Sequence, residues 1–415
     1  MDSYTVQLTI PNTHLLVDGE SNAPIPGLVS ISPATSAFAS PVSAACRPEI
    51  TLKLVRLVSS RRPRPPSPGN ETSSKTLPWR RRTAQVRPLP FQIPNAQSQT
   101  LAECIIWYSP DVSSLDLQER KFSFSLPIPG NIPPTADTVL GTVSYTITAT
   151  VRFESSVSVQ DSQPIKIRRA APPEPVWHTR AYPGSPVVTE LCIAPCPPET
   201  RRTGRQAQYD IEWQAKSTVL DGERESEIKY VVAEEVRWQV DETVKCLSLA
   251  RQENRTNRRK IVGSQERTRQ ICQGAIAGRW LAGSGRKDRP GEAGAEGRIE
   301  IPFQVRIPTA IDEIDTSSYF GDPECVHGEE MDEMETLAIT VSHRLHLEVV
   351  TGEDTFHRET GDLVERRRRV RSYKAVFALP VREVAETDFL NQLRAATGLP
   401  MYEDPHPALP EYSGE

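Results

Sequence analysis

The chain has 415 residues, a formal net charge of −5 at pH 7, and 37 prolines against 22 glycines. This length predicts two or three domains with separate cores, and the balanced charge argues against a general nucleic-acid-binding protein. The many prolines favour short elements joined by turns over long helices.

The sequence contains no apolar run that could span a bilayer, and its start, MDSYTVQLTIPNTH, lacks the pattern of a secretory signal. The seven cysteines are an odd number without a repeated spacing, which argues against a disulfide framework. We therefore expect a cytoplasmic protein, or one recruited peripherally to a membrane from the cytoplasmic side.

Alternation of apolar and polar residues predicts half-buried antiparallel strands along most of the chain. The clearest is LGTVSYTITATVRF, in which Val143, Tyr145 and Ile147 share one face with later apolar residues. The other candidates are 49–58, 103–109, 121–126, 209–215, 235–240, 298–308, 338–350 and 373–381. Many short strands without a regular alternation of strands and helices predict an all-β chain of immunoglobulin-like antiparallel β-sandwiches.

The proline-rich stretch 168–186 is expected to be a stiff connector, which sets the domains at 1–170 and 171–385. Residues 251–297 are basic and glycine-rich, and we expect a long mobile insertion there. Similar surface loops are expected over 59–75 and 322–336. A short helix is predicted between Thr387 and Gly398, followed by an extended proline-rich tail within 386–415.

No catalytic or metal-binding motif is visible, so we expect neither enzyme activity nor a cofactor. Cys192 and Cys196 lack a second ligand pair at a zinc-like spacing and are interpreted as ordinary thiols. His343 and His346 fall on opposite faces of one strand, where they cannot chelate one ion. A packing histidine and a surface histidine are the simpler interpretation. A further alternative is an enzyme whose active site the sequence does not reveal. That hypothesis would require the purified chain to turn over a substrate.

The segment ERRRRVRSYK is the most basic stretch, and its guanidinium groups are candidates for contact with anionic lipid or an acidic cytosolic tail. The alternative is a solvated strand face that protects a sheet edge from aggregation. Both interpretations remain open at this point. The residues concerned are Arg366, Arg367, Arg368, Arg369 and Arg371.

The tail carries one short signature twice, as Leu-Pro-Met-Tyr and Leu-Pro-Glu-Tyr. An extended Pro-x-Tyr segment suits a WW domain, because proline stacks in an aromatic groove and tyrosine fills a neighbouring pocket. Two copies on one tail also favour bivalent engagement. The predicted WW-domain-binding residues are Leu399, Pro400, Tyr402, Leu409, Pro410 and Tyr412.

Residues 121–153, KFSFSLPIPGNIPPTADTVLGTVSYTITATVRF, resemble the arrestin N-terminal domain of fungal arrestin-related trafficking adaptors, the α-arrestins. The later AITVSHRLHLEVV and the closing ALPV are similar to the arrestin C-terminal domain, and proline-tyrosine motifs are typical of these tails. The resemblance implies two β-sandwiches in an arrestin-like arrangement. The tail departs from the usual motif, since it has LPxY in place of PPxY.

The same resemblance implies an adaptor that binds the cytosolic tails of membrane transporters or receptors. Its own tail would hold the WW domains of a HECT-type ubiquitin ligase of the Rsp5/Nedd4 kind and promote ubiquitin-dependent endocytosis. Peripheral recruitment to the plasma membrane, endosome or Golgi is then expected. An arrestin-fold scaffold for signalling or vesicle sorting that recruits no ligase is the alternative.

Overall fold

The computed structural model describes residues 4–18, 24–33, 49–61, 96–106, 120–152, 158–196, 206–251, 259–281, 297–308, 316–317 and 336–385. Every regular element in these ranges is a β-strand, which confirms the predicted all-β class. Within the same ranges there is no helix long and apolar enough to cross a membrane. The helix predicted between Thr387 and Gly398 lies outside the described residues.

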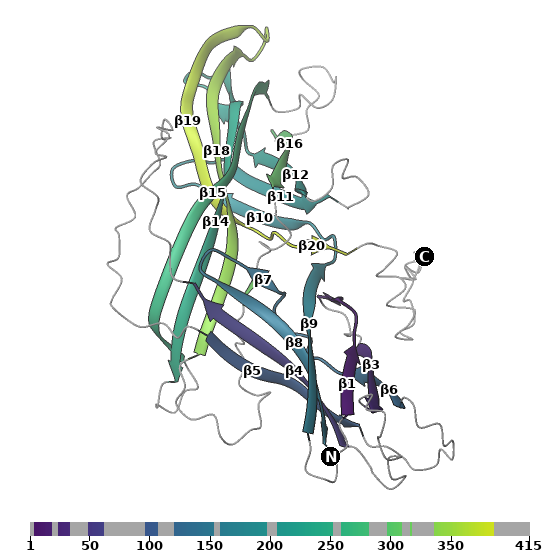
Figure 1. Ribbon diagram of the computed structural model, residues 1–415. Coiled ribbons are helices and arrows are strands. Elements are labelled where there is room, and N and C mark those ends of the chain that lie inside the picture. The colour runs from purple at the N-terminus through teal and green to yellow at the C-terminus, as the bar shows by residue number, and fades with distance from the viewer. Residues whose placement is uncertain are drawn as a thin grey trace, which may run out of the picture.

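The first sandwich packs a small antiparallel sheet, ordered β1-β3-β6, against a larger one ordered β2-β9-β8-β4-β5 (Figure 1). The short strands β7 and β20 join the larger sheet. The bounds are β1 Tyr4–Thr9, β2 Thr13–Val17, β3 Ile25–Pro33, β4 Glu49–Ser60, β5 Ala96–Ile106, β6 Arg120–Leu126, β7 Ala136–Asp137, β8 Gly141–Arg152, β9 Ser158–Ala171 and β20 Glu383–Val384.

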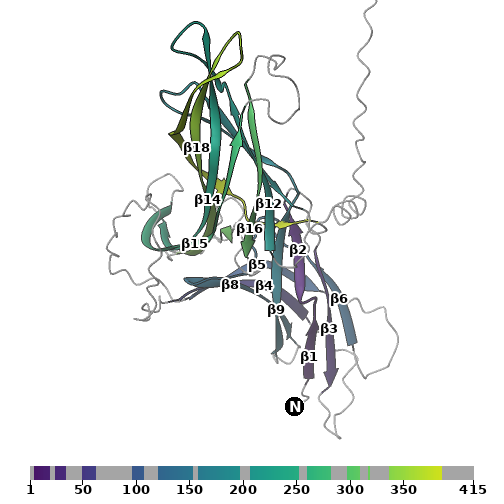
Figure 2. The ribbon, with the colours of Figure 1, turned by 90° about the horizontal axis from the view of Figure 1, so that it is seen from above.

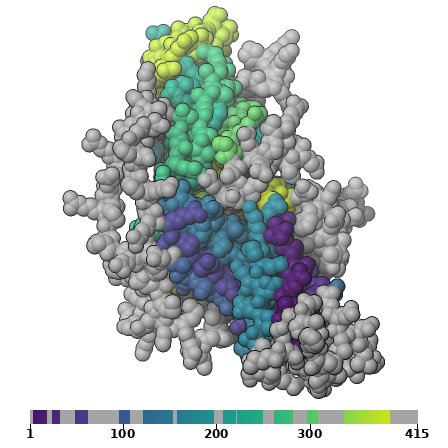
Figure 3. Space-filling model, in the orientation of Figure 1, coloured from purple at the N-terminus to yellow at the C-terminus, as the bar shows by residue number. Residues whose placement is uncertain are grey.

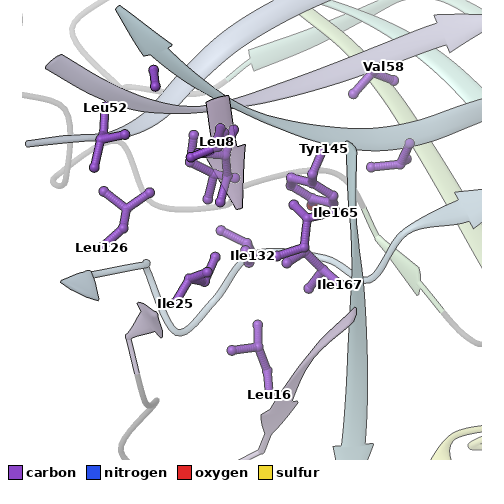
Figure 4. Close-up of a cluster of buried hydrophobic side chains, with 14 of the residues drawn as sticks. Leu8, Leu16, Ile25, Leu52, Val58, Leu126, Ile132, Tyr145, Ile165 and Ile167 are labelled. Atoms are coloured by element: carbon purple, nitrogen blue, oxygen red, sulfur yellow. The ribbon is translucent and has the colours of Figure 1, made fainter. Parts of the chain in front are cut away.

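Apolar side chains from both sheets meet between them and form the first core (Figure 4). Leu8, Ile25 and Leu126 come from the small sheet, and they face Leu52 and Tyr145 of the large one. Along β8 the buried and partly buried residues alternate strictly, as the sequence pattern predicted. The buried phenol of Tyr145 donates a hydrogen bond to the carbonyl of Pro133, at 2.6 Å.

The second sandwich pairs a sheet ordered β10-β11-β12-β16 with a larger sheet built on β14 and β18. In the larger sheet β13 and β15 pair with β14, while β17 and β19 pair with β18. The bounds are β10 Val176–Ala181, β11 Val188–Pro195, β12 Gln206–Lys216, β13 Val219–Asp221, β14 Glu227–Arg251, β15 Arg259–Trp280, β16 Ile299–Pro308, β17 Thr316–Ser317, β18 Thr336–His357 and β19 Leu363–Leu379.

Strands β14 and β18 run from the second sandwich onto the first, so one sheet contributes to both cores (Figure 2). The two strands pair antiparallel from Glu227 to Leu249. Burial of one aliphatic side chain stabilises a fold by about 2 kcal/mol, so separation of the two sandwiches would be costly. The side chains placed in the first core are Val244, Cys246, Leu337, Ile339 and Val341, and those placed in the second include Val236, Val240, Leu345, Leu347 and Val349.

A close contact at Gly141 lets the shared sheet reach the first core. A Cβ atom at Gly141 would lie 2.2 Å from the carbonyl oxygen of Ser59 and 2.7 Å from the Cδ1 of Ile339. The carbonyl belongs to the backbone of β4, which pairs with β8, so it cannot turn aside as a flexible side chain can. Glycine at this position is therefore required for β18 to pack against the end of β8.

A polar row interrupts the apolar face of the shared sheet where the two cores meet. Glu242 of β14 lies opposite His343 of β18 and opposite Arg269 of β15. Arg269 donates to both carboxylate oxygens of Glu242, with Nε 2.6 Å from Oε1, and the His343 Nε2 is 3.5 Å from Oε2. Glu242 and His343 are both buried. The buried Glu242 carboxylate thus lies between the guanidinium group of Arg269 and the imidazole of His343.

Burial acts to raise the pKa of Glu242, but the hydrogen bonds from His343 and Arg269 outweigh it and lower this pKa below its ordinary value. The ionised form is therefore the one that the fold stabilises.

Two expectations about connections need correction. The connector expected over 168–186 is largely strand, and residues 172–175 alone separate β9 from β10. The mobile insertion expected over 251–297 is wrong for 259–280, which form β15 along the edge of β14. The first half of β15 is polar and shows no apolar alternation. Residues 264–270 pair with β14 alone and expose most of their side chains, so this part of the strand has no buried face to mark in the sequence. Pairing with β14 supplies the order that the pattern did not indicate.

Glu242→Gln is expected to lower the free energy of unfolding by about 3 kcal/mol at pH 7, because Arg269 and His343 lose their buried anionic partner. A lowered carboxyl pKa stabilises the fold above the unfolded pKa, and this contribution disappears as pH falls through the folded pKa. The difference between wild type and variant should therefore shrink below about pH 4. Urea unfolding of both proteins at several pH values measures this difference in the free energy of unfolding.

Glu300→Gln is the matched control, since Glu300 is an exposed β16 residue paired with Arg298. Its effect should stay within about 0.5 kcal/mol. A Glu242→Gln protein as stable as wild type at pH 7 would contradict the structural role given to the polar row.

Candidate functional site

The six predicted WW-domain-binding residues lie in 386–415, outside the described residues. The structure does describe the segment from which this tail departs. Strand β20 pairs parallel with the end of β9, where Glu383 and Val384 lie beside Ala170 and Ala171. The amide of Ala385 then donates to the carbonyl of Ala171 at 3.0 Å. The last described residue is therefore attached to the first sandwich.

Ion pairs on both sides of β20 hold this attachment. Arg382 places its Nη1 3.0 Å from Oδ2 of Asp18, while Arg169 pairs with the other oxygen of that carboxylate. Arg168 donates from Nε to Glu383 at 2.9 Å. Val17, Ala170 and Ala385 form a small apolar cluster under these pairs. We call residues 382–385 the tail root.

The basic run lies on β19, the edge strand beside β18, where its side chains are exposed. Arg366 is 3.4 Å from the buried Asp354. Arg367 pairs with Glu365 at 2.8 Å, and Arg369 is 3.6 Å from Glu235. These partners neutralise much of the charge that the sequence run suggests.

The remaining two arginines differ from one another. Arg371 donates to the carbonyl of Gly184 at 3.4 Å, whereas Arg368 has no hydrogen bond or ion pair with any residue in the described ranges. Charged side chains on β19 would also hinder the edge from pairing with another chain. The geometry thus fits both the protective interpretation and contact with an anionic partner.

Exposed apolar residues accompany the arginines, and the sequence analysis did not single them out. Leu363, Val364 and Val370 on β19 are 44%, 52% and 42% exposed. Figure 3 shows this end of the second sandwich, in yellow, at the opposite end of the molecule from the purple N-terminal strands. The run ERRRRVR contains Val370, but only the three-dimensional structure shows that its side chain faces solvent.

The histidines and cysteines lie as the sequence indicated. His343 is buried, and His346 on the opposite face is 3.2 Å from Asp241. Cys192 and Cys196 are free thiols, and burial raises the pKa of the Cys192 thiol, with the nearby Glu212 adding to the effect. Across the described segments, no group of His, Cys, Asp or Glu is arranged to hold a metal ion.

Arg382→Ala combined with Glu383→Ala should loosen the tail root, because partly exposed ion pairs contribute up to about 1 kcal/mol each. Amide hydrogen exchange at Val384 and Ala385 is expected to accelerate by about tenfold. The control is Lys53→Ala with Glu103→Ala, which removes an ion pair at 3.2 Å between β4 and β5. Equal acceleration at the tail root in both proteins would contradict the assigned role of these ion pairs.

Comparison with known families gives one match. Residues 108–256 match the family model LDB19, described as Arrestin_N terminal like. The matched segment includes β6 to β14, so it takes in strands of both sandwiches. No curated protein matches the chain. The match and the two mainly antiparallel β-sandwiches together support an arrestin-related family.

Proposed function

We propose that the protein is an adaptor that recruits a HECT-type ubiquitin ligase of the Rsp5/Nedd4 kind to membrane transporters or receptors. The observation that carries this proposal is the duplicated Leu-Pro-x-Tyr signature in the tail of a chain with an arrestin-like fold. Leu399, Pro400 and Tyr402 form the first ligase contact. Leu409, Pro410 and Tyr412 form the second.

The position of the tail root supports an adaptor in which the tail binds the ligase and the sandwiches bind the cargo. It attaches residue 385 to the first sandwich, beside the connection between the two sandwiches. A ligase held by the tail therefore remains close to cargo that is bound on the sandwiches. The effective concentration of the ligase at the cargo rises without any further contact.

The arginine run on β19 is the proposed surface for recruitment to the membrane. Arg366, Arg367, Arg368, Arg369 and Arg371 contact anionic lipid or the acidic tail of a cargo protein, which recruits the adaptor peripherally to the plasma membrane, endosome or Golgi. Each basic side chain near an anionic surface contributes about 1 kcal/mol at most, and those already paired contribute less. The sandwiches then select the cargo, and the ligase performs the chemistry.

Titration of the full chain with tandem WW domains of a Nedd4-type ligase tests the ligase contact. Tyr402→Ala and Tyr412→Ala should each weaken apparent binding by about tenfold or more, because each removes one of two linked engagements, and the double change should abolish it. Isothermal calorimetry measures both the affinity and the stoichiometry.

Met401→Ala and Glu411→Ala are the matched controls, since they change the variable position of each motif and leave proline and tyrosine in place. Both should bind as wild type does. Binding that is indifferent to the two tyrosines would remove the ligase from the mechanism and favour a scaffold that recruits none.

A further inference from the structure

Three border strands of the second sandwich each carry a feature that hinders pairing with another chain. β16 contains Pro302 and Pro308, which have no amide hydrogen to donate. β19 carries the arginine run, and β10 has only six residues. Proteins protect exposed sheet borders with proline, charge or short strands, because an unprotected border is a template for another chain. These three borders are therefore poor candidates for an interface.

A fourth border strand, β15, has a stretch without such protection. It pairs with β14 on one side, and no strand in the described ranges pairs with its other side. Residues 272–277, CQGAIA, contain neither proline nor a charged residue, and they pair with β14 without a register shift. We call residues 272–277 the open edge. Its regular backbone can form hydrogen bonds with an added strand.

The second core is incompletely covered along the open edge. Val236 and Val240 of β14 are fully buried, whereas Trp238, which lies between them on the same face, is only partly buried. Cys272 and Ile276, opposite the two valines on β15, are also only partly buried. An added strand would shield these apolar side chains from water, and such burial is the main favourable term in most protein association.

The indole ring of Trp238 extends across β15 toward its free side. A Cβ atom at Gly274 would lie 2.3 Å from Cζ2 of Trp238, so the ring covers this glycine. On its other side the ring stacks on Phe303, with 5.0 Å between the ring centroids. The Cβ atoms of directly opposite residues in a sheet are about 4.5–5.5 Å apart. A large apolar side chain opposite Gly274 on an added strand would therefore contact the indole ring.

A second copy of the open edge supplies such a side chain when it pairs antiparallel about a two-fold axis at Ala275. Ile276 of each copy then lies opposite Gly274 of the other and contacts the Trp238 ring of that copy. Moving the axis to Gly274 would place this glycine opposite itself, and moving it to Ile276 would place Gly274 opposite Gly278. Large-to-small packing therefore selects the axis at Ala275.

The exposed face of the same pairing contains no repulsive contact. Gln273, Ala275 and Ala277 are exposed, and the axis at Ala275 places Gln273 of one copy opposite Ala277 of the other. No like charges meet within the open edge, and a two-fold interface closes after two copies. The open edge thus fits a second copy of the chain on both of its faces.

We propose that two copies of the chain form a dimer through the open edge, antiparallel and with the two-fold axis at Ala275, so that their large sheets join into one. This inference does not depend on the ligase or the membrane role proposed above. A dimer would carry four Leu-Pro-x-Tyr motifs on its two tails, and it would thereby increase the avidity for any partner that the motifs bind.

Analytical ultracentrifugation of the full chain over a micromolar concentration range tests the dimer. The mass should approach that of two chains and fall toward one chain on dilution. Gln273→Lys combined with Ala277→Lys places like charges opposite one another twice, so it should raise the dimer dissociation constant by about tenfold or more. Gln273→Glu combined with Ala277→Lys places opposite charges there and should dimerise within about threefold of wild type.

Thr179→Lys combined with Ala181→Lys is the matched control, since it adds the same charge to exposed positions of another border strand, β10. This protein should dimerise as wild type does. Thermal unfolding of all three variants verifies that the exposed changes leave the fold intact, as is usual for surface substitutions.

Oxidative cross-linking tests the register without adding charge. Opposite residues in an antiparallel pair have Cα atoms about 4.5–5.5 Å apart, within the range that a disulfide spans. Ala275→Cys should therefore form a covalent dimer across the axis, visible on a non-reducing gel against oxidised wild type. Gln273→Cys alone should not, because it lies opposite Ala277, but a mixture with Ala277→Cys protein should cross-link.

Each contrary outcome would overturn a stated part of the proposal. Single chains at every concentration, with no cross-link from Ala275→Cys, would overturn the dimer. A dimer that the paired lysines leave unchanged would show that another surface forms it. Cross-linking by Gln273→Cys alone would overturn the register. Single chains whose residues 272–277 are already protected from amide hydrogen exchange on the free side would show that another segment of the same chain occupies the open edge.

Discussion

The pairing of β14 with β18 is the interaction on which the rest of the architecture depends. One face of this two-stranded unit is apolar along most of its length, and it enters the first core at one end and the second core at the other. The sandwiches therefore share a sheet in addition to the short connection at 172–175. Pulling them apart would expose Leu337, Ile339 and Val341 to water, which is costly because apolar burial is the main favourable term in folding.

The row of Arg269, Glu242 and His343 stands where the apolar face passes from one core to the other. A buried carboxylate is tolerated only with compensating donors, and both neighbouring strands supply them. This requirement restricts the register of three strands at once, since a slip by one residue would move Glu242 away from its partners. Polar residues thus specify the alignment at the point where apolar packing is least continuous.

This shared sheet also determines where the proposed contacts lie. The tail root is attached to β9 in the first sandwich, and the exposed end of β19 lies at the far end of the second (Figure 1). Ligase and membrane would then engage different parts of the molecule. β18 links the two parts of the molecule, because it contributes to the first core at one end and pairs with β19 in the second sandwich at the other.

The sequence supported several local predictions because they depend on periodicity. The alternation from Val143 to Val151 predicted β8, and that from Ile299 to Ile307 predicted β16, since a half-buried strand shows its two faces directly in the chain. The separate faces of His343 and His346 followed from the same rule. β15 was missed because an edge strand with one neighbour has little apolar patterning to display.

The candidate sites divide in a similar way. A linear motif such as Leu-Pro-x-Tyr is contained in adjacent residues, so the sequence alone is enough to predict Tyr402 and Tyr412 as contacts, and it also shows the arginines of β19 as a basic run. Which arginines are neutralised, which approach one another, and which apolar side chains face water depend on strand register and on a bulge opposite Gly352. Arg279 meets Asp354 across strands that are distant in the chain, and only tertiary structure decides such a contact, because hydrogen-bonded pairing determines which distant residues become neighbours.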